Sequence, residues 1–357
     1  MSKVHLVSIT RAASREEVAA KLGALWRAAG LAECFRPRDL AAVKVHVGEP
    51  GRPTYVPPRV VRELVSLIKQ SEASPFVTDT AVLYRSPRDN GVGHTMVAAD
   101  HGYDLEGVGC PFVPADGLNG ADEIDVTVNG KHDETVAIAS AIVHARSMLV
   151  VTHATGHLGT GFGGTLKNLG MGCSSKKGKL RQHSGQTPSI DAEACTSCGT
   201  CAEWCPADAI EVDDVAVIDA ETCIGCGECV ATCLDGAVRF DWSVMGRDLQ
   251  ERIVEHAAAV VRGKPDRIAY VTVAYDITQD CDCLGRDQPS IVPDIGILAS
   301  RDPVALDRAV LDLVRERAGQ TLESLSYPDR DGTVQIDYAA EMELGESHAE
   351  VVEVDVR

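Results

Sequence analysis

The first 155 residues alternate between short apolar runs and apolar positions at helical spacing. Short apolar runs predict buried strands, and they occur at 4–9, 41–47, 75–80 and 147–152. Helical spacing predicts helices at 14–29, 58–70, 89–102 and 137–146. Strands that alternate with helices are typical of a parallel sheet covered on both faces. We therefore expect an α/β fold with a doubly wound, mostly parallel sheet.

The same alternation returns in the C-terminal third, where we expect a helix at 246–262, a strand at 267–274 and a helix at 303–316. A segment that holds eight of the 13 cysteines separates the two regions. The pattern predicts three parts: an α/β domain at 1–187 with a glycine–lysine loop, an inserted ferredoxin-like module at 188–241, and a second α/β half at 242–357.

Composition limits the cellular compartments in which we expect this protein. A chain of 357 residues can bury large cores without disulfides, so 13 cysteines need another explanation. The start, MSKVHLVSIT, lacks the apolar core of a signal peptide, and no apolar run reaches the roughly 18 residues that span a bilayer. We expect a cytoplasmic, reducing setting, where clustered cysteines hold metal more often than they form disulfides.

The net charge of −19 argues against nucleic acid and anionic membranes as partners, because both require a basic face. The acidity serves either solubility alone or the docking of a basic redox partner.

Two cysteine runs share the spacing C-x₂-C-x₂-C-x₃-C. The first run ends in Pro206, whereas the second has Leu234 at that place. This spacing is typical of bacterial two-cluster ferredoxins, in which three thiolates hold one cubane and the fourth reaches the other cluster. We expect one [4Fe–4S] cluster on Cys195, Cys198, Cys201 and Cys233, and a second on Cys223, Cys226, Cys229 and Cys205.

Two alternatives compete with this interpretation of the cysteines. One is a zinc site, although zinc prefers four-ligand groups split across two knuckles; the other is a set of disulfides. If clusters are present, they serve either as an electron relay or as a structural element, and two adjacent clusters suit a relay better.

A glycine-rich and lysine-rich segment follows the strand predicted at 147–152. His153 and His157 lie at the end of that strand, and Lys167 and Asn168 follow the glycines. The carboxyl ends of strands are where open α/β sheets bind ligands, and exposed N–H groups in such a loop form an anion-binding nest. Basic residues reverse the local charge at Lys176, Lys177, Lys179 and Arg181. The segment predicts a phosphate or carboxylate site, with a flexible, solvated loop over 156–187 as the alternative.

Other polar residues are candidates for the same site. Lys44 and His46 share one face of a predicted strand, although His46 fits a structural role equally well. Asp79 ends a strand, where it either holds a ligand or caps the next helix. Cys281 and Cys283 flank Asp282 and are poorly placed for a mutual disulfide at this spacing. They either line a site as thiolate ligands or are inert buried thiols.

Several motifs together resemble the domain-of-unknown-function family numbered 362, in its ferredoxin-carrying branch. They are KVHVGEPG at 44–51, VTDT at 77–80, GHLGTGFGGTLKNLGMG at 156–172, CDC at 281–283 and PDIGILASRDPVALD at 293–307. The resemblance implies an electron-transfer or reductase role.

The order of His157, Gly161, Lys167 and His183 is also similar, more distantly, to the nickel-pincer lactate racemase family. That likeness implies a cofactor-bearing role for Lys167 and a nickel-ligand role for His183. Racemases lack a ferredoxin insertion, so the likeness implies the fold and the position of the pocket rather than the reaction.

We therefore expect an electron-transfer protein or oxidoreductase that passes single electrons through two clusters to a site at 156–185. Flavin mononucleotide is the favoured occupant, because flavins couple one-electron clusters to two-electron chemistry. His157 and Lys167 would be catalytic, and the cofactor would contact Lys44, His46, Asp79, His153, Gly161, Gly163, Gly164, Asn168 and His183. The final acceptor would be a partner protein or a small molecule. The alternatives are a non-catalytic carrier that docks a redox partner and a racemase-like nickel enzyme.

Overall fold

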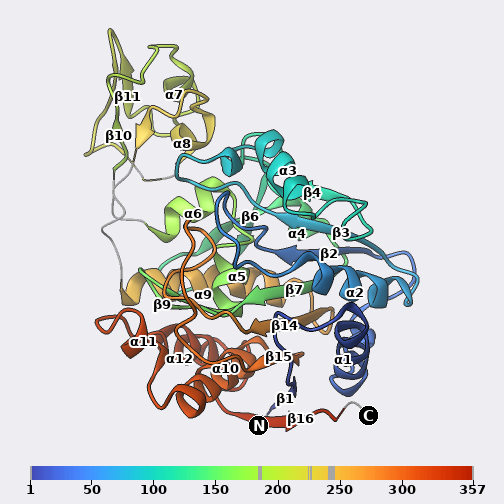
Figure 1. The fold of residues 1–357 in the computed structure, drawn as a ribbon. Coiled ribbons are helices and arrows are strands. Elements are labelled where there is room, and N and C mark those ends of the chain that lie inside the picture. The colour runs from blue at the N-terminus through green and yellow to red at the C-terminus, as the bar shows by residue number, and fades with distance from the viewer. Residues whose placement is uncertain (1, 184–186, 224, 226, 240–245, 356–357) are drawn as a thin grey trace.

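The computed structural model describes residues 2–183, 187–223, 225, 227–239 and 246–355. Its body is built around one eight-stranded sheet, which Figure 1 shows crossing the molecule. In order across the sheet, the strands are β16 (Ala349–Glu353), β1 (Ser2–Val7), β15 (Gly296–Ser300), β14 (Ile268–Ala274), β7 (Ser147–His153), β2 (Leu40–Val45), β3 (Ser74–Asp79) and β4 (Phe112–Pro114).

The sheet is mostly parallel, as the sequence predicted. Neighbouring strands from β14 to β4 all pair in parallel. Only β15, among these eight strands, runs against the others, because it pairs antiparallel with both β14 and β1. Strand β1 lies between two strands from the C-terminal third. The regions before and after the cysteine-rich segment therefore complete a single sheet.

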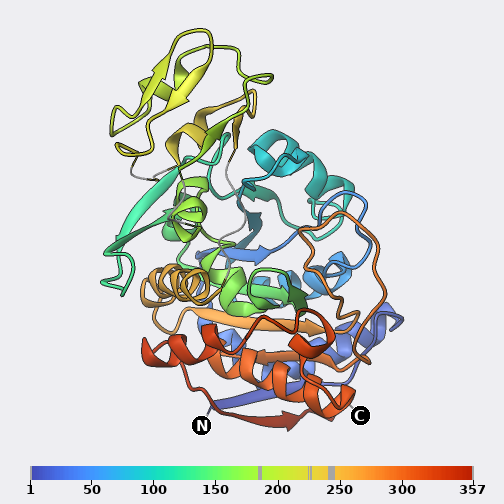
Figure 2. The ribbon, with the colours of Figure 1, turned by 90° about the vertical axis from the view of Figure 1, so that its left-hand side faces the viewer.

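Helices cover both faces of this sheet, because its strands are apolar on both sides. In β7, Leu149 and Val151 pack into one apolar core, whereas Met148 and Val150 pack into the other. The first core is covered by α1 (Arg15–Ala28), α2 (Pro58–Lys69) and α3 (Gly91–Asp100). The second is covered by α5 (Thr165–Gly170), α9 (Arg247–Arg262), α10 (Pro303–Ala318) and α12 (Val334–Glu341). Figure 1 shows α1 and α2 on one side of the strands, and Figure 2 looks onto the other side, which α9, α10 and α12 cover.

Local sequence accounts for where the main helices begin. The Ser14 side chain accepts a hydrogen bond from the Glu17 amide at the start of α1, and Asp302 does the same for two amides of α10. Pro58 opens α2, where a first turn tolerates proline. No helix in the described part of the chain is long and apolar enough to cross a membrane.

Two predictions about local structure were wrong. A helix was expected at 137–146, but β6 (Thr135–Ala139) pairs antiparallel with β5 (Glu123–Thr127), and only α4 (Ser140–His144) is helical. The run TVAIA is rich in β-branched residues, and a partner strand was available to it.

The segment 156–187 was expected to form an irregular loop. It instead contains β8 (Thr155–His157), β9 (Gly161–Gly163), α5 and α6 (Lys176–Gln182). Ser175 caps α6 locally, whereas the cap of α5 comes from Asp307 on α10. A cap from so far along the chain leaves no sign in the local pattern.

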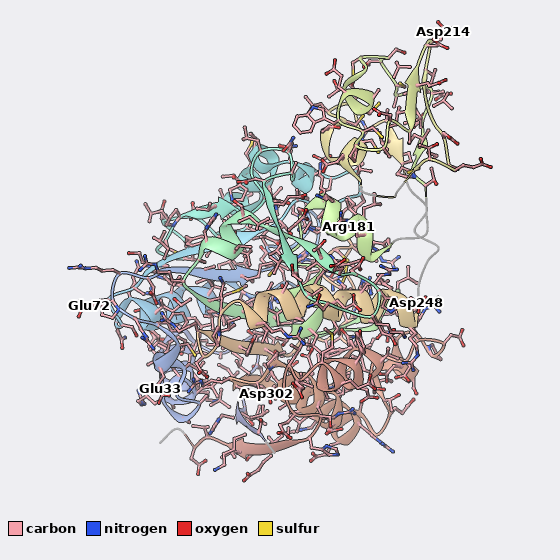
Figure 3. All side chains as sticks on the ribbon, turned by 180° about the vertical axis from the view of Figure 1, so that it is seen from behind. Glu33, Glu72, Arg181, Asp214, Asp248 and Asp302 are labelled. Atoms are coloured by element: carbon pink, nitrogen blue, oxygen red, sulfur yellow. A yellow bond between two sulfur atoms is a disulfide. The ribbon has the colours of Figure 1, made fainter. Side chains whose placement is uncertain are left out.

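The described residues between 187 and 239 form a small lobe at one end of the body (Figures 1 and 3). Its two-stranded sheets pair β10 (Ser189–Ile190) with β13 (Val238–Arg239), and β11 (Ile210–Val212) with β12 (Ala216–Ile218). Each cysteine run contains one short helix, α7 (Thr200–Glu203) or α8 (Glu228–Thr232). Figure 3 shows Asp214 at the far tip of the lobe and Arg181 where the body meets it.

Short turns and helices complete the described chain. They are the 3₁₀ helices η1 (Leu31–Cys34) and η2 (Pro87–Asp89) and the helix α11 (Leu322–Leu325). Of these, η2 carries Arg88 into the interior, where the guanidinium is fully buried.

Candidate functional site

A cavity of about 500 Å³ lies at the carboxyl ends of β2, β3 and β7. This is the edge at which open α/β sheets bind ligands. The structure brings ten residues that the sequence singled out to its wall: Lys44, His46, Asp79, His153, His157, Gly163, Gly164, Lys167, Asn168 and His183. Gly161 is not among the lining residues. What each side chain does there stays a prediction.

Lys44 reaches the cavity floor from β2 and is held by two partners. Its Nζ lies 2.9 Å from Asp79 Oδ1 and donates to Asn168 Oδ1 at 2.7 Å. Asn168 Nδ2 in turn donates to the Val151 carbonyl at 3.1 Å. Lys44 therefore links three neighbouring elements, and its charge is balanced within the wall.

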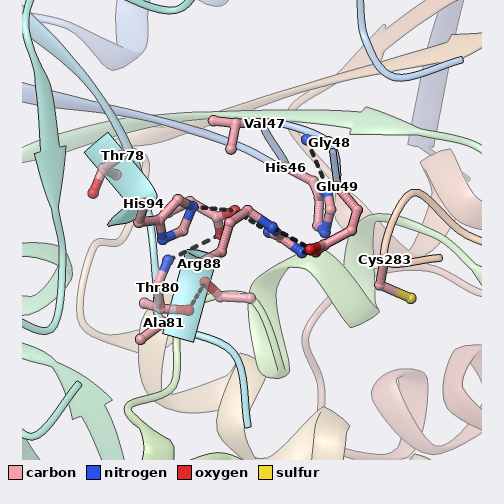
Figure 4. Close-up of polar contacts among 12 residues, drawn as sticks. His46, Val47, Gly48, Glu49, Thr78, Thr80, Ala81, Arg88, His94 and Cys283 are labelled. Atoms are coloured by element: carbon pink, nitrogen blue, oxygen red, sulfur yellow. Dashed lines mark hydrogen bonds and ion pairs between the residues drawn. The ribbon is translucent and has the colours of Figure 1, made fainter. Parts of the chain in front are cut away.

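Asp79 is the centre of a buried ion network, whose members Arg88, His94 and Glu49 are labelled in the close-up of Figure 4. Arg88 Nη1 and His94 Nε2 each lie 3.5 Å from Asp79 Oδ2, and Arg88 Nη2 lies 2.7 Å from Glu49 Oε2. Burial alone would raise the pKa of Asp79, but Lys44 and His94 hold it well below its ordinary value. Asp79 therefore stays ionised within this network.

Sequence reasoning missed Arg88, Glu49 and His94 as parts of this ion network. Arg88 lies in a polar stretch whose local pattern resembles an ordinary turn, although the side chain is fully buried. Only the pairing of β2 with β3 brings Glu49 and Asp79 to the same guanidinium.

The segment 280–284 closes another wall and is anchored through Asp282. Arg52 Nε donates to Asp282 Oδ1 at 3.1 Å, and Arg52 Nη2 donates to the Asp280 carbonyl at 2.9 Å. His153 Nδ1 lies 2.9 Å from the same carboxylate oxygen. Burial would lower the pKa of His153, but Asp282 raises it above its ordinary value. Arg52 was also missed, because its partner lies 230 residues away.

Cys281 and Cys283 form a disulfide, which corrects the expectation that their spacing disfavours one. The chain turns at this point, since the Leu284 amide donates to the Cys281 carbonyl at 3.1 Å. The turn brings the two Cα atoms to 5.4 Å, within the range that disulfides accept. Both cysteines line the cavity.

His157 faces the cavity with its tautomer set by the backbone. Its Nδ1 accepts hydrogen bonds from the amides of Gly159 and Thr160, both at 3.1 Å. Burial, with Lys167 and His183 nearby, lowers its pKa well below the ordinary value. The hydrogen bonds therefore assign a neutral ring that carries its proton on Nε2.

Lys167 differs from the other lysines that line the cavity, because its ammonium group has no hydrogen-bond or ion-pair partner among the described residues. Lys44 and Lys179 also line the cavity, but protein groups hold their ammonium groups. Burial and the nearby charge of Lys44 lower the pKa of Lys167 to about 8. Near neutral pH this amine can bind an anion or exchange a proton.

We expect the reactivity of Lys167 to report this shift. Its labelling by an amine-reactive reagent should rise with pH around 8, well below the value near 10.4 of an exposed lysine. Mass spectrometry of the labelled peptide across a pH series measures the midpoint. Lys3 on β1 is a suitable reference amine, and equal midpoints for the two lysines would contradict the assignment.

Protein groups engage most of the basic residues after Lys167. Lys177 lies 2.8 Å from Glu123 and 3.7 Å from Glu228, and Arg181 lies 3.8 Å from Asp125. Lys179 is buried and donates to the Ser174 carbonyl at 2.6 Å, and burial lowers its pKa to about 8. Most of this positive charge is therefore used within the protein.

The glycines of the segment pack mainly against protein. An added Cβ at Gly161 would lie 2.9 Å from the Arg330 carbonyl oxygen, and Gly161 also has a left-handed φ of 70°. At Gly164 it would lie 2.6 Å from Asp307 Oδ2. These positions need glycine for folding, whatever binds in the cavity.

Asp307 positions Lys167 indirectly, because it caps the helix that carries this lysine. Its carboxylate accepts hydrogen bonds from the amides of Thr165 at 2.7 Å and Leu166 at 2.9 Å. Burial raises its pKa to about 6, so the group is ionised at neutral pH.

We expect Asp307→Ala to lower the free energy of unfolding by about 2 kcal/mol, the upper end for a lost cap. Urea denaturation at neutral pH measures the change. Asp312→Ala, at an exposed position of the same helix α10, is the matched control and should change little. Equal effects of the two substitutions would contradict the capping role.

The small lobe places the two cysteine runs around two cavities. One is lined by Cys195, Cys198, Cys201 and Cys233, and the other by Cys205, Cys223 and Cys229. Cys226 lies outside the described residues. The two runs also share one detail: the Cys205 and Cys233 sulphurs each accept a hydrogen bond from the amide four residues on, both at 3.2 Å.

The fold and the cavity define an α/β protein with a ligand-sized site at the carboxyl edge of a mostly parallel sheet. The chain belongs to the family described as Domain of unknown function (DUF362), whose model matches residues 41–312. The resemblance to this family is thereby confirmed, while its ferredoxin-carrying branch stays a prediction. No curated protein matches the chain.

Two solved structures are similar to the chain at low identity. One is the lactate racemase apoprotein from Thermoanaerobacterium thermosaccharolyticum, at 11% identity and a TM-score of 0.38, covering 76% of this chain and 50% of that one. The other is a structural-genomics target from Thermotoga maritima, at 10% identity and a TM-score of 0.40, covering 74% and 51%. The chain thus spans about half the length of each.

Proposed function

We propose that this protein is an iron–sulphur redox protein, in which electrons pass through two [4Fe–4S] clusters of the small lobe to a substrate in the central cavity. The observation that carries the proposal is the crosswise grouping of the thiols. Cys233 belongs to the second run but lines a cavity with three cysteines of the first, and Cys205 does the reverse. Two cubanes held by cysteine runs of this spacing require this grouping, because each cubane takes three thiolates from one run and the fourth from the other.

The spacing of the thiols supports a cubane over a single zinc ion. Four thiolates about 2.3 Å from a tetrahedral zinc lie roughly 3.8 Å from one another. Among the described residues of the small lobe, no three cysteine sulphurs lie within 4.8 Å of each other. The amides that point at Cys205 and Cys233 would stabilise added negative charge on the sulphurs. Bound clusters would supply one-electron transfer at this position.

Helix α6 joins the small lobe to the cavity and supports a route for transfer between the two. Leu180 belongs to the apolar core of the lobe together with Cys201 and Cys229, and a Cβ at Gly227 would lie 2.5 Å from it. Lys179, the preceding residue of the same helix, lines the cavity. One short helix therefore contacts both places.

The cavity favours a small organic anion as substrate. Its volume of about 500 Å³ lies within the usual range for small-molecule sites. Lys167 supplies an ammonium that pairs with no group of the described chain, and His157 Nε2–H can donate a hydrogen bond. Lys167, with a pKa of about 8, would orient the anion and protonate the reduced product, and His157 would hold that product by a hydrogen bond.

Flavin mononucleotide stays a candidate occupant, since the cavity volume admits an isoalloxazine ring. Its phosphate would have to use Lys167 or Lys179, because Lys177 and Arg181 are engaged elsewhere. Flavin fluorescence after acid release of the anaerobically purified protein decides this point.

Iron and acid-labile sulphide, measured on the full chain purified without oxygen, test the proposal. We expect both elements in equal amounts and a visible absorbance that bleaches with a one-electron donor. Cys201→Ser should lose half of the iron, whereas Cys34→Ser, a buried thiol in the body, should keep all of it. Zinc in place of iron, or iron without sulphide, would overturn the proposal.

The same anaerobically purified protein distinguishes the proposal from its two alternatives, a non-catalytic electron carrier and a racemase-like nickel enzyme. Lys167→Ala should abolish reduction of a small-molecule acceptor while the clusters still bleach; unchanged turnover would favour a non-catalytic carrier. Stoichiometric nickel that disappears in Lys167→Ala and His183→Ala would favour the racemase-like enzyme.

A further inference from the structure

The cavity contains a disulfide that the proposed function has not used. Cys281 and Cys283 are joined on the wall formed by residues 280–284, in the cavity that Lys167 and His157 also line. One ring nitrogen of His157 and the two sulphurs all lie within 4.8 Å of each other. A disulfide beside a hydrogen-bond donor in a ligand-sized cavity is an arrangement for redox chemistry rather than for stapling, because it closes only one intervening residue.

We propose that Cys281–Cys283 is a redox-active disulfide, the two-electron acceptor of the proposed relay, and that its dithiol form reduces a small anionic disulfide in the central cavity. This inference rests on the proposed function for its electron source. Clusters deliver electrons singly, whereas thiol–disulfide chemistry takes them in pairs. The Cys281–Cys283 couple would therefore convert one-electron transfer into two-electron chemistry, the role for which a flavin was expected.

The chemistry balances in two steps. In the first, two electrons from the reduced iron–sulphur clusters and two protons from solvent break the S–S bond and leave two thiols. In the second, one cysteine thiolate attacks the substrate disulfide, releases the first substrate thiol and forms a mixed disulfide. The other cysteine then attacks the cysteine sulphur of that mixed disulfide, re-forms Cys281–Cys283 and releases the second substrate thiol.

Protein contacts hold the disulfide in place and favour binding of the substrate. The Arg52 and His153 contacts to Asp282, and the hydrogen bond from Tyr84 Oη to the Cys283 carbonyl at 3.1 Å, hold the turn in place while the sulphurs change partners. Lys167 provides the charge that attracts an acidic substrate and favours a thiolate. The apolar lining, including Leu158, Leu249 and Leu284, suits the carbon skeleton of such a substrate.

The same three groups could instead bind a metal ion, but His157 argues against it. Its Nδ1 lone pair accepts two backbone N–H bonds, and the neutral ring then carries a proton on Nε2. Neither nitrogen is left with a lone pair for a metal, whereas Nε2–H can donate a hydrogen bond to a leaving thiolate.

Differential alkylation of the full chain tests the disulfide directly. The protein is purified without oxygen, treated or not with reduced methyl viologen, denatured, alkylated with iodoacetamide and digested. We expect the peptide with residues 281–283 to gain two alkyl groups only after reduction. In Cys201→Ser, methyl viologen should fail, while dithiothreitol should still reduce the pair. Both thiols alkylated before any reduction would overturn the inference.

Two further outcomes separate this inference from the proposed function. Clusters that are present and bleach while the 281–283 peptide stays oxidised would overturn the inference and leave the proposed function standing. A protein without iron and sulphide would overturn both. Zinc or nickel that is bound stoichiometrically and lost in Cys283→Ser would show a metal site in place of the disulfide.

Turnover is tested with lipoate, a small disulfide that carries a carboxylate. With excess reduced methyl viologen, the wild-type chain should form dihydrolipoate, measured by mass spectrometry, and Cys281→Ser should lose this activity. Cys110→Ser, which alters a buried thiol that does not line the cavity, should retain it. Equal rates in the Cys281→Ser and Cys110→Ser proteins would overturn the substrate class.

Discussion

Cys233→Ser is expected to remove the cluster that belongs to the first cysteine run, although Cys233 lies in the second. The reason is spatial, because Cys233 lines the cavity of Cys195, Cys198 and Cys201. Anaerobically prepared protein should lose half of its iron. The low-temperature electron paramagnetic resonance spectrum of the remaining reduced cluster should match that of Cys201→Ser.

Cys205→Ser provides the matched comparison in the other run. It should give the complementary spectrum, shared with Cys223→Ser, since these two cysteines line the second cavity. If Cys233→Ser instead matched Cys223→Ser, each run would hold its own cluster. The crosswise arrangement, and the main support for the relay, would then be lost.

Asp79→Ala is expected to lower the free energy of unfolding by about 3–5 kcal/mol, as loss of one partner from a buried ion network does. Lys44 Nζ lies 2.9 Å from Asp79 and would be left buried beside Arg88 without this carboxylate. Urea unfolding at neutral pH measures the loss. Glu33→Ala is the control: its pair with Arg301 is largely exposed and should contribute at most about 1 kcal/mol.

The pH dependence gives this prediction a second readout. The pKa of Asp79 is depressed in the folded protein, so the folded state binds a proton here less readily than the unfolded chain. The stabilisation is present above the unfolded pKa of about 3.9 and is lost as pH falls through the folded value. The wild type should therefore lose more stability on acidification below pH ~4 than Asp79→Asn does. Parallel pH profiles would contradict the role of the charge.

The sequence pattern was sufficient to predict the large helices and strands of the body. The helix at 246–262 and the strand at 267–274 were placed to within a residue at each end, because apolar periodicity reflects burial and caps lie next to the helices that they end. The segment after β7 was the main failure. Its helix α5 depends on Asp307, some 140 residues later, for its first two hydrogen bonds.

The candidate site was likewise predicted only in part. A strand that ends in His153 and is followed by Lys167 was enough to predict a site at this edge, since the carboxyl ends of parallel strands meet there. The partners of those residues were beyond reach: Arg52 and Asp282, or Glu49 and Arg88, meet only after the sheet has formed.

By itself, the sequence determined the α/β class, the edge of the sheet at which the cavity lies, and the spacing of the eight cysteines. These features follow from short-range periodicity and from local spacing along the chain. Only the tertiary structure decided that Cys281 and Cys283 are joined, and that Lys167 is left without a partner among the described residues. Those outcomes depend on contacts between segments up to 230 residues apart, whose energies no local pattern encodes.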